Sequence, residues 1–97
     1  MKPTTSSEFL AFLVEYFASK KDHKSAQAIG SQGLGFSFQS AGIDSLAMME
    51  LIMAIEDHHD VNIPVSQLPE IRTAAELFGL VCRLCDVEPE YDGLAVV

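Results

Sequence analysis

The segment from Asp44 to His58 constrains the fold of this chain more than any other part of its sequence. It contains no Gly and no Pro, and Leu, Ala, Met and Glu, which are all good helix formers, dominate it. We predict a helix that begins at Asp44 or Ser45 and ends near His58. At 100° per residue, the apolar positions of this helix fall into two stripes that lie about 145° apart.

The two stripes differ in the residues that border them. One stripe has the spacing of a buried helical face and consists of Met48, Leu51, Ile52 and Ile55. The other begins beside Ser45 and consists of Leu46, Met49 and Met53, with Glu50, Glu56 and Asp57 on its flanks. An apolar strip with an acidic border is typical of a docking surface. A helix covered on two sides would also show two stripes, so the pattern alone leaves both interpretations open.

Helix-start signals occur on both sides of this central segment. Thr5-x-x-Glu8 and Thr73-x-x-Glu76 both fit a capping box, in which two side chains satisfy the amides that a helix start leaves unpaired. We therefore predict a first helix over residues 5–17 and a last helix over residues 73–85. Gly79 lies inside the last helix, where a glycine costs roughly 1 kcal/mol relative to alanine.

The predicted fold class is all-α, because no alternating strand pattern competes with these helices. We expect a small bundle of three main helices plus a short fourth segment near residues 66–68. A long loop over residues 19–42 would join the first two main helices, with one short turn at residues 26–29. Phe36 and Phe38 would hold the end of this loop on the core. Residues 1–85 would form the helical domain and residues 86–97 an acidic, flexible tail.

Charge narrows the classes of partner. The formal net charge is −8, and no Lys or Arg occurs between Lys24 and Arg72. Such a surface repels nucleic acid and anionic membranes and favours partners that present Lys and Arg. We see no signal peptide, and no run approaches the ~18 apolar residues that suggest a spanning helix. We therefore predict a cytoplasmic, soluble monomer with neither nucleic acid nor membrane as a partner.

A motif at the start of the central helix carries the functional prediction. The segment Gly42-Ile43-Asp44-Ser45-Leu46 is followed by Glu50-Leu51, by the Ile63-Pro64 break and by Thr73-Ala74-Ala75-Glu76-Leu77. Together these features closely resemble the acyl carrier protein family over about residues 36–84. In that family, the serine of Asp-Ser-Leu is esterified by a 4′-phosphopantetheine taken from coenzyme A. The resemblance therefore implies that Ser45 is the attachment site and that the arm carries its cargo as a thioester.

The resemblance also implies a role for the residues around Ser45. Asp44 would be both a motif residue and the cap of the helix. Carriers of this family present the same helix to partner enzymes, so the matching positions here are Leu46, Met49, Glu50, Met53, Glu56 and Asp57. The implied partners are a phosphopantetheinyl transferase and loading ligases, synthases or transferases with basic docking patches. The implied cargo is an acyl or aminoacyl intermediate of fatty-acid, polyketide or related biosynthesis, and we expect a specialised carrier.

Alternative roles for Ser45 are weaker. A plain capping serine in a helical interaction module without phosphopantetheine is the main one. A catalytic serine fits poorly because Gly-x-Ser-x-Gly is absent, and we predict no catalytic residue and no enzyme activity. We interpret Cys82 and Cys85 as buried or surface cysteines of a helix, and the glycines at 30, 33 and 35 as flexible loop.

The segment from Asp57 to Asp60 reads as a solvated helix end. A metal-binding regulatory domain that uses His58, His59 and Asp60 is a third possibility, although adjacent helical residues point apart. The sequence therefore predicts no metal site.

Overall fold

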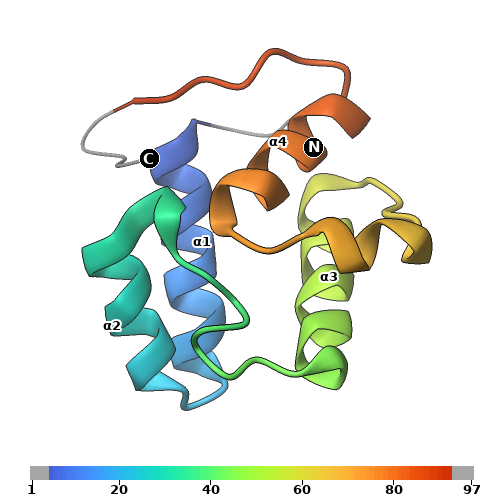
Figure 1. Ribbon diagram of the computed structural model, residues 1–97. Coiled ribbons are helices and arrows are strands. Elements are labelled where there is room, and N and C mark those ends of the chain that lie inside the picture. Colours follow the sequence, from blue (N-terminus) through green and yellow to red (C-terminus); the bar gives the residue numbers. More distant parts are fainter. Residues whose placement is uncertain (1–4, 93–97) are drawn as a thin grey trace.

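The computed structural model describes residues 5–92, and helices account for the regular structure within them (Figure 1). In chain order the elements are α1 (Ser6–Ser19), α2 (His23–Gln32), the 3-10 helix η1 (Gly33–Gly35), α3 (Ser45–His59), the 3-10 helix η2 (Val65–Glu70) and α4 (Ala74–Leu84). The only strand-like pairings among the described residues are two isolated bridges. The prediction of an all-α fold is therefore confirmed.

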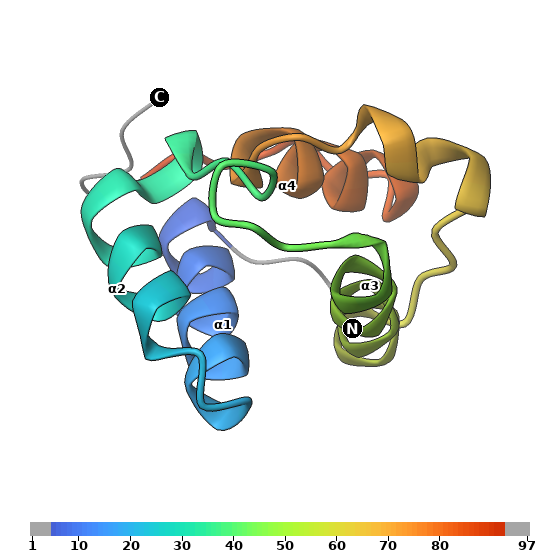
Figure 2. The ribbon, with the colours of Figure 1, turned by 60° about the horizontal axis from the view of Figure 1, so that its bottom comes forward.

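The helices are arranged around one core. α1 and α2 lie side by side with opposite directions, α3 stands apart from this pair, and α4 with η2 lies across the end of the bundle far from Ser45 (Figures 1 and 2). The buried apolar side chains come from every one of the α-helices and include Phe9, Leu13, Ile29, Leu51, Ile55, Leu77, Phe78 and Val81. None of the helices described here is long and apolar enough to cross a lipid bilayer.

Local capping signals define two helix starts. The Glu8 N–H donates to Thr5 Oγ1 at 3.4 Å, and the Thr5 N–H donates to Glu8 Oε1 at 3.2 Å. Thr73 and Glu76 exchange the same pair of bonds at 3.2 and 3.0 Å. Each box satisfies amides that have no acceptor inside the helix. Both predicted boxes are confirmed.

The long first loop is the main error of the sequence prediction. Residues 23–32 form the helix α2, whereas we expected one short turn at residues 26–29. Asp22 caps this helix, because its Oδ1 accepts the Ser25 N–H at 3.1 Å. Only Ser25 and Ile29 of α2 are buried, so the helix lacks the apolar stripe that pattern analysis requires. Its packing against α1 supplies the stability that its composition does not signal.

The segment after α4 makes contacts that a free tail would not make. The Ser6 N–H donates to the Glu90 carbonyl at 2.8 Å, and Asp92 accepts bonds from the Ser7 N–H at 2.9 Å and the Ser7 hydroxyl at 2.8 Å. Tyr91 packs edge-on against Phe78, with 5.6 Å between the ring centroids. Residues 86–92 are thus packed on the bundle, whereas we expected this segment to belong to a flexible tail. Residues 93–97 lie outside the described residues, and the division of the chain at residue 85 stays a prediction.

The end of α3 contains a buried histidine. His59 is 2% exposed, and neither ring nitrogen has a hydrogen-bond partner among residues 5–92. Its ring lies 6.1 Å from that of Phe9 and 4.8 Å from that of His58, which stacks on Phe12. The solvated end that we expected is therefore wrong for His59, which lies four residues after Ile55 and continues the same buried face, whereas Asp57 and Asp60 are exposed.

Burial sets the charge state of this histidine. Desolvation lowers the pKa of His59, because the charged ring would lie in an apolar environment, and the charge of His58 lowers it further. The unfolded chain, with a pKa near ~6.5, therefore binds a proton more readily than the folded chain does. Stability contributed by neutral His59 is complete above about pH 6.5 and is lost as the pH falls toward the folded-state pKa.

We predict that the free energy of unfolding decreases when the pH is lowered from about 7.5 to about 5.5. Uptake of one proton on unfolding changes the free energy of unfolding by at most about 1.4 kcal/mol per pH unit. His59→Leu should reduce this pH dependence, whereas His23→Gln on the exposed face of α2 should leave it unchanged. Urea unfolding at several pH values measures both slopes. Equal slopes for the wild type and His59→Leu would contradict the prediction.

A second prediction concerns the contact between Asp92 and the start of α1. The bonds from Ser7 hold the pKa of Asp92 at about 2, so the carboxylate stays charged above about pH 4 and the contact is lost as the pH falls toward 2. Asp92→Ala should accelerate hydrogen exchange of the Ser7 amide and lower the melting temperature at pH 7. Glu88→Ala in the same segment is the control. An unchanged Ser7 exchange rate would show that the contact does not persist in solution.

Candidate functional site

The chain that leads to Ser45 is fixed to the start of α4. Phe36 and Phe38 are 1% and 2% exposed and meet edge-to-face, with 5.4 Å between their ring centroids. The Ala74 N–H donates to the Phe36 carbonyl at 2.9 Å, and the Phe38 N–H donates to the Arg72 carbonyl at 3.0 Å. The alternation of these two phenylalanines with a serine predicted that they hold the end of the loop on the core, and the structure adds the attachment to the start of α4. This attachment anchors the loop shortly before the helix begins.

A tight turn then directs the chain into α3. The Gly42 N–H donates to the Gln39 carbonyl at 3.0 Å, and the Ile43 N–H donates to the Phe38 carbonyl at 3.1 Å. Gly42 has a φ of 78°, a value that side chains other than glycine rarely adopt. This glycine therefore lets the loop close between its anchor and the start of α3.

Asp44 ends the loop and caps α3. Its Oδ1 accepts the Ala47 N–H at 2.9 Å, and its backbone is extended, as at a typical cap. Ser45 is the first residue of the helix and is exposed. Within the described residues, the N–H groups of Ser45 and Leu46 have no acceptor, and the Ser45 hydroxyl has no hydrogen-bond partner.

This geometry suits a phosphate group. Two unpaired amides and the positive end of the helix dipole lie next to an exposed hydroxyl, and such a helix start binds anions well. A nucleophilic serine would need a neighbouring base, and no His or carboxylate accepts a bond from the Ser45 hydroxyl in residues 5–92. The described residues also contain no group of three or more His, Cys, Asp or Glu that could hold a metal ion.

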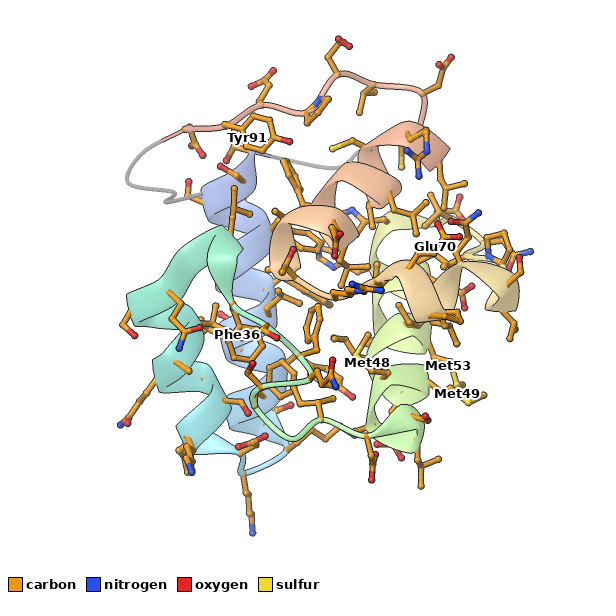
Figure 3. All side chains as sticks on the ribbon, viewed as in Figure 1. Phe36, Met48, Met49, Met53, Glu70 and Tyr91 are labelled. Carbon is orange, nitrogen blue, oxygen red and sulfur yellow. The ribbon has the colours of Figure 1, made fainter. Side chains whose placement is uncertain are left out.

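The two stripes of α3 face different surroundings. Leu51, Ile52 and Ile55 are buried in the core, and Met48 is half-buried beside them. The second stripe is exposed, with 68% of Leu46, 48% of Met49 and 63% of Met53 accessible to solvent. Figure 3 shows Met49 and Met53 pointing away from the bundle and Met48 pointing toward it. The second stripe is therefore surface rather than core.

The structure extends this stripe beyond α3. Val65 at the start of η2 is 72% exposed, and it lines a shallow groove of about 230 Å³ together with Met49, Met53 and Leu68. Sequence reasoning missed Val65, because the contact depends on how η2 folds back beside α3. Its only signal in the sequence is an apolar residue directly after a proline.

The acidic residues that flank the stripe do not all have the same surroundings. Glu50 and Asp57 are exposed, and their carboxylates accept no hydrogen bond within the described chain. Glu56 instead accepts the Ile63 N–H through Oε2 at 2.7 Å. This bond holds the connection between α3 and η2, so Glu56 has a structural role that the sequence did not reveal.

The two cysteines belong to the core side of α4. Cys82 is 1% exposed and Cys85 is half-buried, and both thiols are free. Burial raises the pKa of both thiols, which disfavours the reactive thiolate. They are therefore packing residues, as the sequence interpretation expected.

Comparisons with known proteins identify the family of this chain. The profile of the family described as "Phosphopantetheine attachment site" matches residues 34–90. The chain is 44% identical over 39 residues to a probable acyl carrier protein of Caulobacter vibrioides and 40% identical over 52 residues to an acyl carrier protein homolog of Ureaplasma parvum. It is also 40% identical over 42 residues to an acyl carrier protein of Syntrophobacter fumaroxidans.

The extent of these matches is limited. They cover 40%, 54% and 43% of this chain and span 45%, 68% and 52% of the three relatives, respectively. No solved structure gives a significant match. The family profile nevertheless covers more than half of the chain, including the capped start of α3 and the whole of α4. This chain therefore belongs to the phosphopantetheine attachment site family, whose prosthetic group is 4′-phosphopantetheine.

Proposed function

We propose that the chain is a carrier protein that holds an acyl or aminoacyl intermediate on a 4′-phosphopantetheine arm attached to Ser45. The observation that carries this proposal is an exposed serine hydroxyl at a capped helix start, beside two unpaired amides and an exposed apolar stripe. The relatives named as acyl carrier proteins support the same role. The chain would serve as a cofactor-bearing partner rather than as an enzyme.

The residues at the start of α3 would hold the arm in place. Ser45 Oγ would form the phosphate ester, and the N–H groups of Ser45 and Leu46 would donate to the phosphate oxygens. Asp44 keeps the first turn intact by accepting the Ala47 amide. When bound, the arm supplies a terminal thiol that carries the cargo as a thioester, so this chain contributes position and recognition.

The exposed stripe of α3 would be the docking face for partner enzymes. Leu46, Met49 and Met53 offer adaptable apolar contacts, and methionine in particular packs against varied surfaces. Glu50 and Asp57 would steer partners with basic patches, because complementary charge raises the association rate more than the affinity. Glu56 adds negative charge, although its carboxylate also holds the Ile63 amide.

The partners we propose follow from the family of the chain, and the acidic surface of α3 is complementary to basic patches on them. A phosphopantetheinyl transferase would attach the arm, and loading ligases, synthases or transferases would charge it in fatty-acid, polyketide or related biosynthesis. The alternative is a helical interaction module that lacks the arm and keeps the fold. It predicts no attachment at Ser45, so the experiment below separates the two.

We predict that incubation with coenzyme A, Mg²⁺ and a broad-specificity phosphopantetheinyl transferase adds the mass of one phosphopantetheine to the chain. Intact-protein mass spectrometry measures the gain, and peptide mapping should place it on Ser45. Ser45→Ala should abolish the gain, whereas Ser40→Ala in the preceding loop should preserve it. A mass gain that persists in Ser45→Ala would place the arm elsewhere. No gain in the wild type would support the module without an arm.

A further prediction tests the docking face. Glu50→Lys and Asp57→Lys should each slow this modification by about tenfold at low salt, because they reverse charges that steer a basic partner. The difference should shrink as the salt concentration rises. Glu15→Lys on the exposed side of α1 makes the same change in net charge and is the matched control. Equal rates for all three variants would show that only net charge matters and would remove α3 as the docking face.

A further inference from the structure

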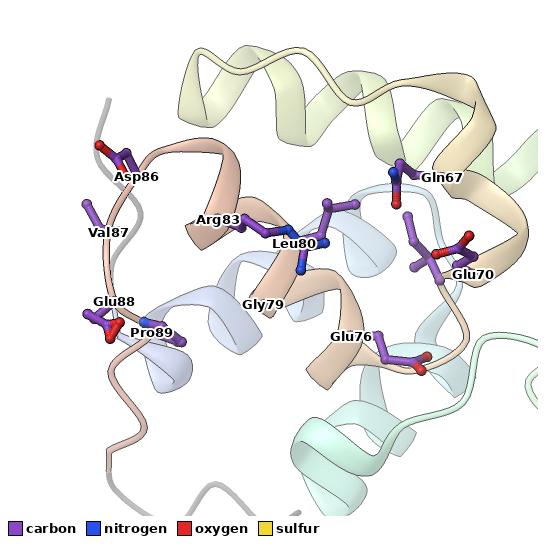
Figure 4. Close-up of a pocket in the computed structure, with 11 residues that line it drawn as sticks. Gln67, Glu70, Glu76, Gly79, Leu80, Arg83, Asp86, Val87, Glu88 and Pro89 are labelled. Atoms are coloured by element: carbon purple, nitrogen blue, oxygen red, sulfur yellow. The ribbon is translucent and has the colours of Figure 1, made fainter.

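A second surface groove lies beside α4 (Figure 4). It has a volume of about 690 Å³ and opens between α4, the end of η2 and residues 86–89. Its apolar lining comes from Ile71, Leu80, Val87 and Pro89. None of the residues on the exposed stripe of α3 lines it, so it is separate from the proposed docking face.

The groove leaves open space above a glycine inside a helix. Gly79 lies in the middle of α4, where glycine is less favourable than alanine. Apart from its two chain neighbours and the adjoining backbone of α4 itself, no atom of the described chain lies within 4 Å of the position that a Cβ on Gly79 would occupy. The packing of the chain therefore does not require this glycine. Because Gly79 has no side chain, another molecule can approach the backbone of α4 at this position.

The charges that line the groove have mostly one sign. Four acidic residues contribute to it, namely Glu70, Glu76, Asp86 and Glu88, and Arg83 is the cation among the lining residues. Glu76 Oε1 accepts the Arg72 N–H at 2.8 Å as part of the helix cap. Arg83 forms no ion pair within residues 5–92, and four carboxylates against one guanidinium leave the described lining of the groove with a net negative charge. The groove is complementary to a cationic occupant.

One wall of the groove is held firmly. Residues 86–89 continue directly into the contact in which Asp92 accepts three bonds from Ser6 and Ser7. Tyr91 reinforces this contact by packing against Phe78 of α4. The groove therefore has a preformed wall, which reduces the entropy that an occupant must lose on binding. In Figure 1 this wall lies at the end of the bundle opposite to the start of α3.

We propose that this groove binds a basic segment of a partner protein, which places an apolar side chain over Gly79 and Leu80 and directs Lys or Arg side chains toward the four carboxylates. Nucleic acid and anionic lipid are disfavoured because the groove and the whole chain are acidic. This inference rests on the carrier function proposed above. In such a carrier, a partner in the groove would hold the protein from the side that faces away from Ser45. Enzymes could then still reach the arm and the face of α3.

The test uses the whole chain and a short synthetic peptide rich in Lys and Leu as the probe. When the peptide is titrated into the ¹⁵N-labelled chain, the NMR resonances of the amides of residues 79–89 should shift. Gly79→Leu fills the floor of the groove, and Glu88→Lys reverses one rim charge. Each should weaken peptide binding at these amides by about tenfold. Glu15→Lys matches Glu88→Lys in net charge and should leave binding at the groove unchanged.

A stability measurement guards against misfolding of the glycine variants. Gly79→Ala should raise the melting temperature by about 4–8 °C, because alanine is the better helix former and the Cβ meets open space. A fall in the melting temperature would mean that Gly79 is needed for packing and would overturn the argument. Glu88→Lys then still tests the rim on an unchanged helix.

The remaining outcomes decide what the groove binds. The proposal would be overturned if the peptide shifted only the amide resonances of α3. It would also be overturned if Gly79→Leu bound the peptide with the affinity of the wild type. Spermine is a cation without apolar side chains; if it reproduced the same shifts with the same affinity, a segment-binding groove would be wrong. Modification of Ser45 in these variants should proceed at the wild-type rate. Failure at the groove therefore remains distinguishable from failure of the carrier function.

Discussion

The position of Ser45 depends on the attachment of the Phe36–Phe38 segment to the start of α4. Two buried rings and two backbone hydrogen bonds hold this segment, and Gly42 turns the chain shortly after it. Because an exposed loop without such an anchor would sample many directions, the anchor decides where α3 begins. The cap from Asp44 then fixes the helix start itself. Every helix start leaves its first amides without an intrahelical acceptor, and here the anchor and the cap place two such amides beside Ser45.

α3 divides its apolar residues between the core and the solvent. Leu51 and Ile55 are fully buried and join the core, so each contributes roughly 1.5–3 kcal/mol by leaving water. Met49 and Met53, on the other face, remain largely exposed and add little to the folded state. On the docking role that we propose, substitutions on the exposed face would change partner choice at a small cost in stability, whereas large-to-small substitutions on the buried face would destabilise the domain.

Negative charge is distributed over two separate surfaces. One follows the exposed stripe of α3, and the other lines the groove between α4 and residues 86–89. Like charges destabilise a compact chain by mutual repulsion, and basic partners would relieve that repulsion at either surface. If both proposals hold, one partner would bind the carrier at the groove while enzymes act on the arm from the face of α3. The contact of Asp92 with Ser6 and Ser7 matters here because it holds the chain directly after residues 86–89, which form one wall of the second surface.

The sequence alone predicted the features that depend on residues close together in the chain. These are the two capping boxes, the two stripes of α3 and the alternation of Phe36 with Phe38. The motif around Ser45 likewise predicted the family. The helix α2, the burial of His59 and the contact between Asp92 and Ser7 were not predicted. Each depends on a surface built by distant parts of the chain, and the Asp92 contact joins positions 85 residues apart. Tertiary structure alone decided these features, because their stability comes from packing and pairing across the bundle rather than from local propensity.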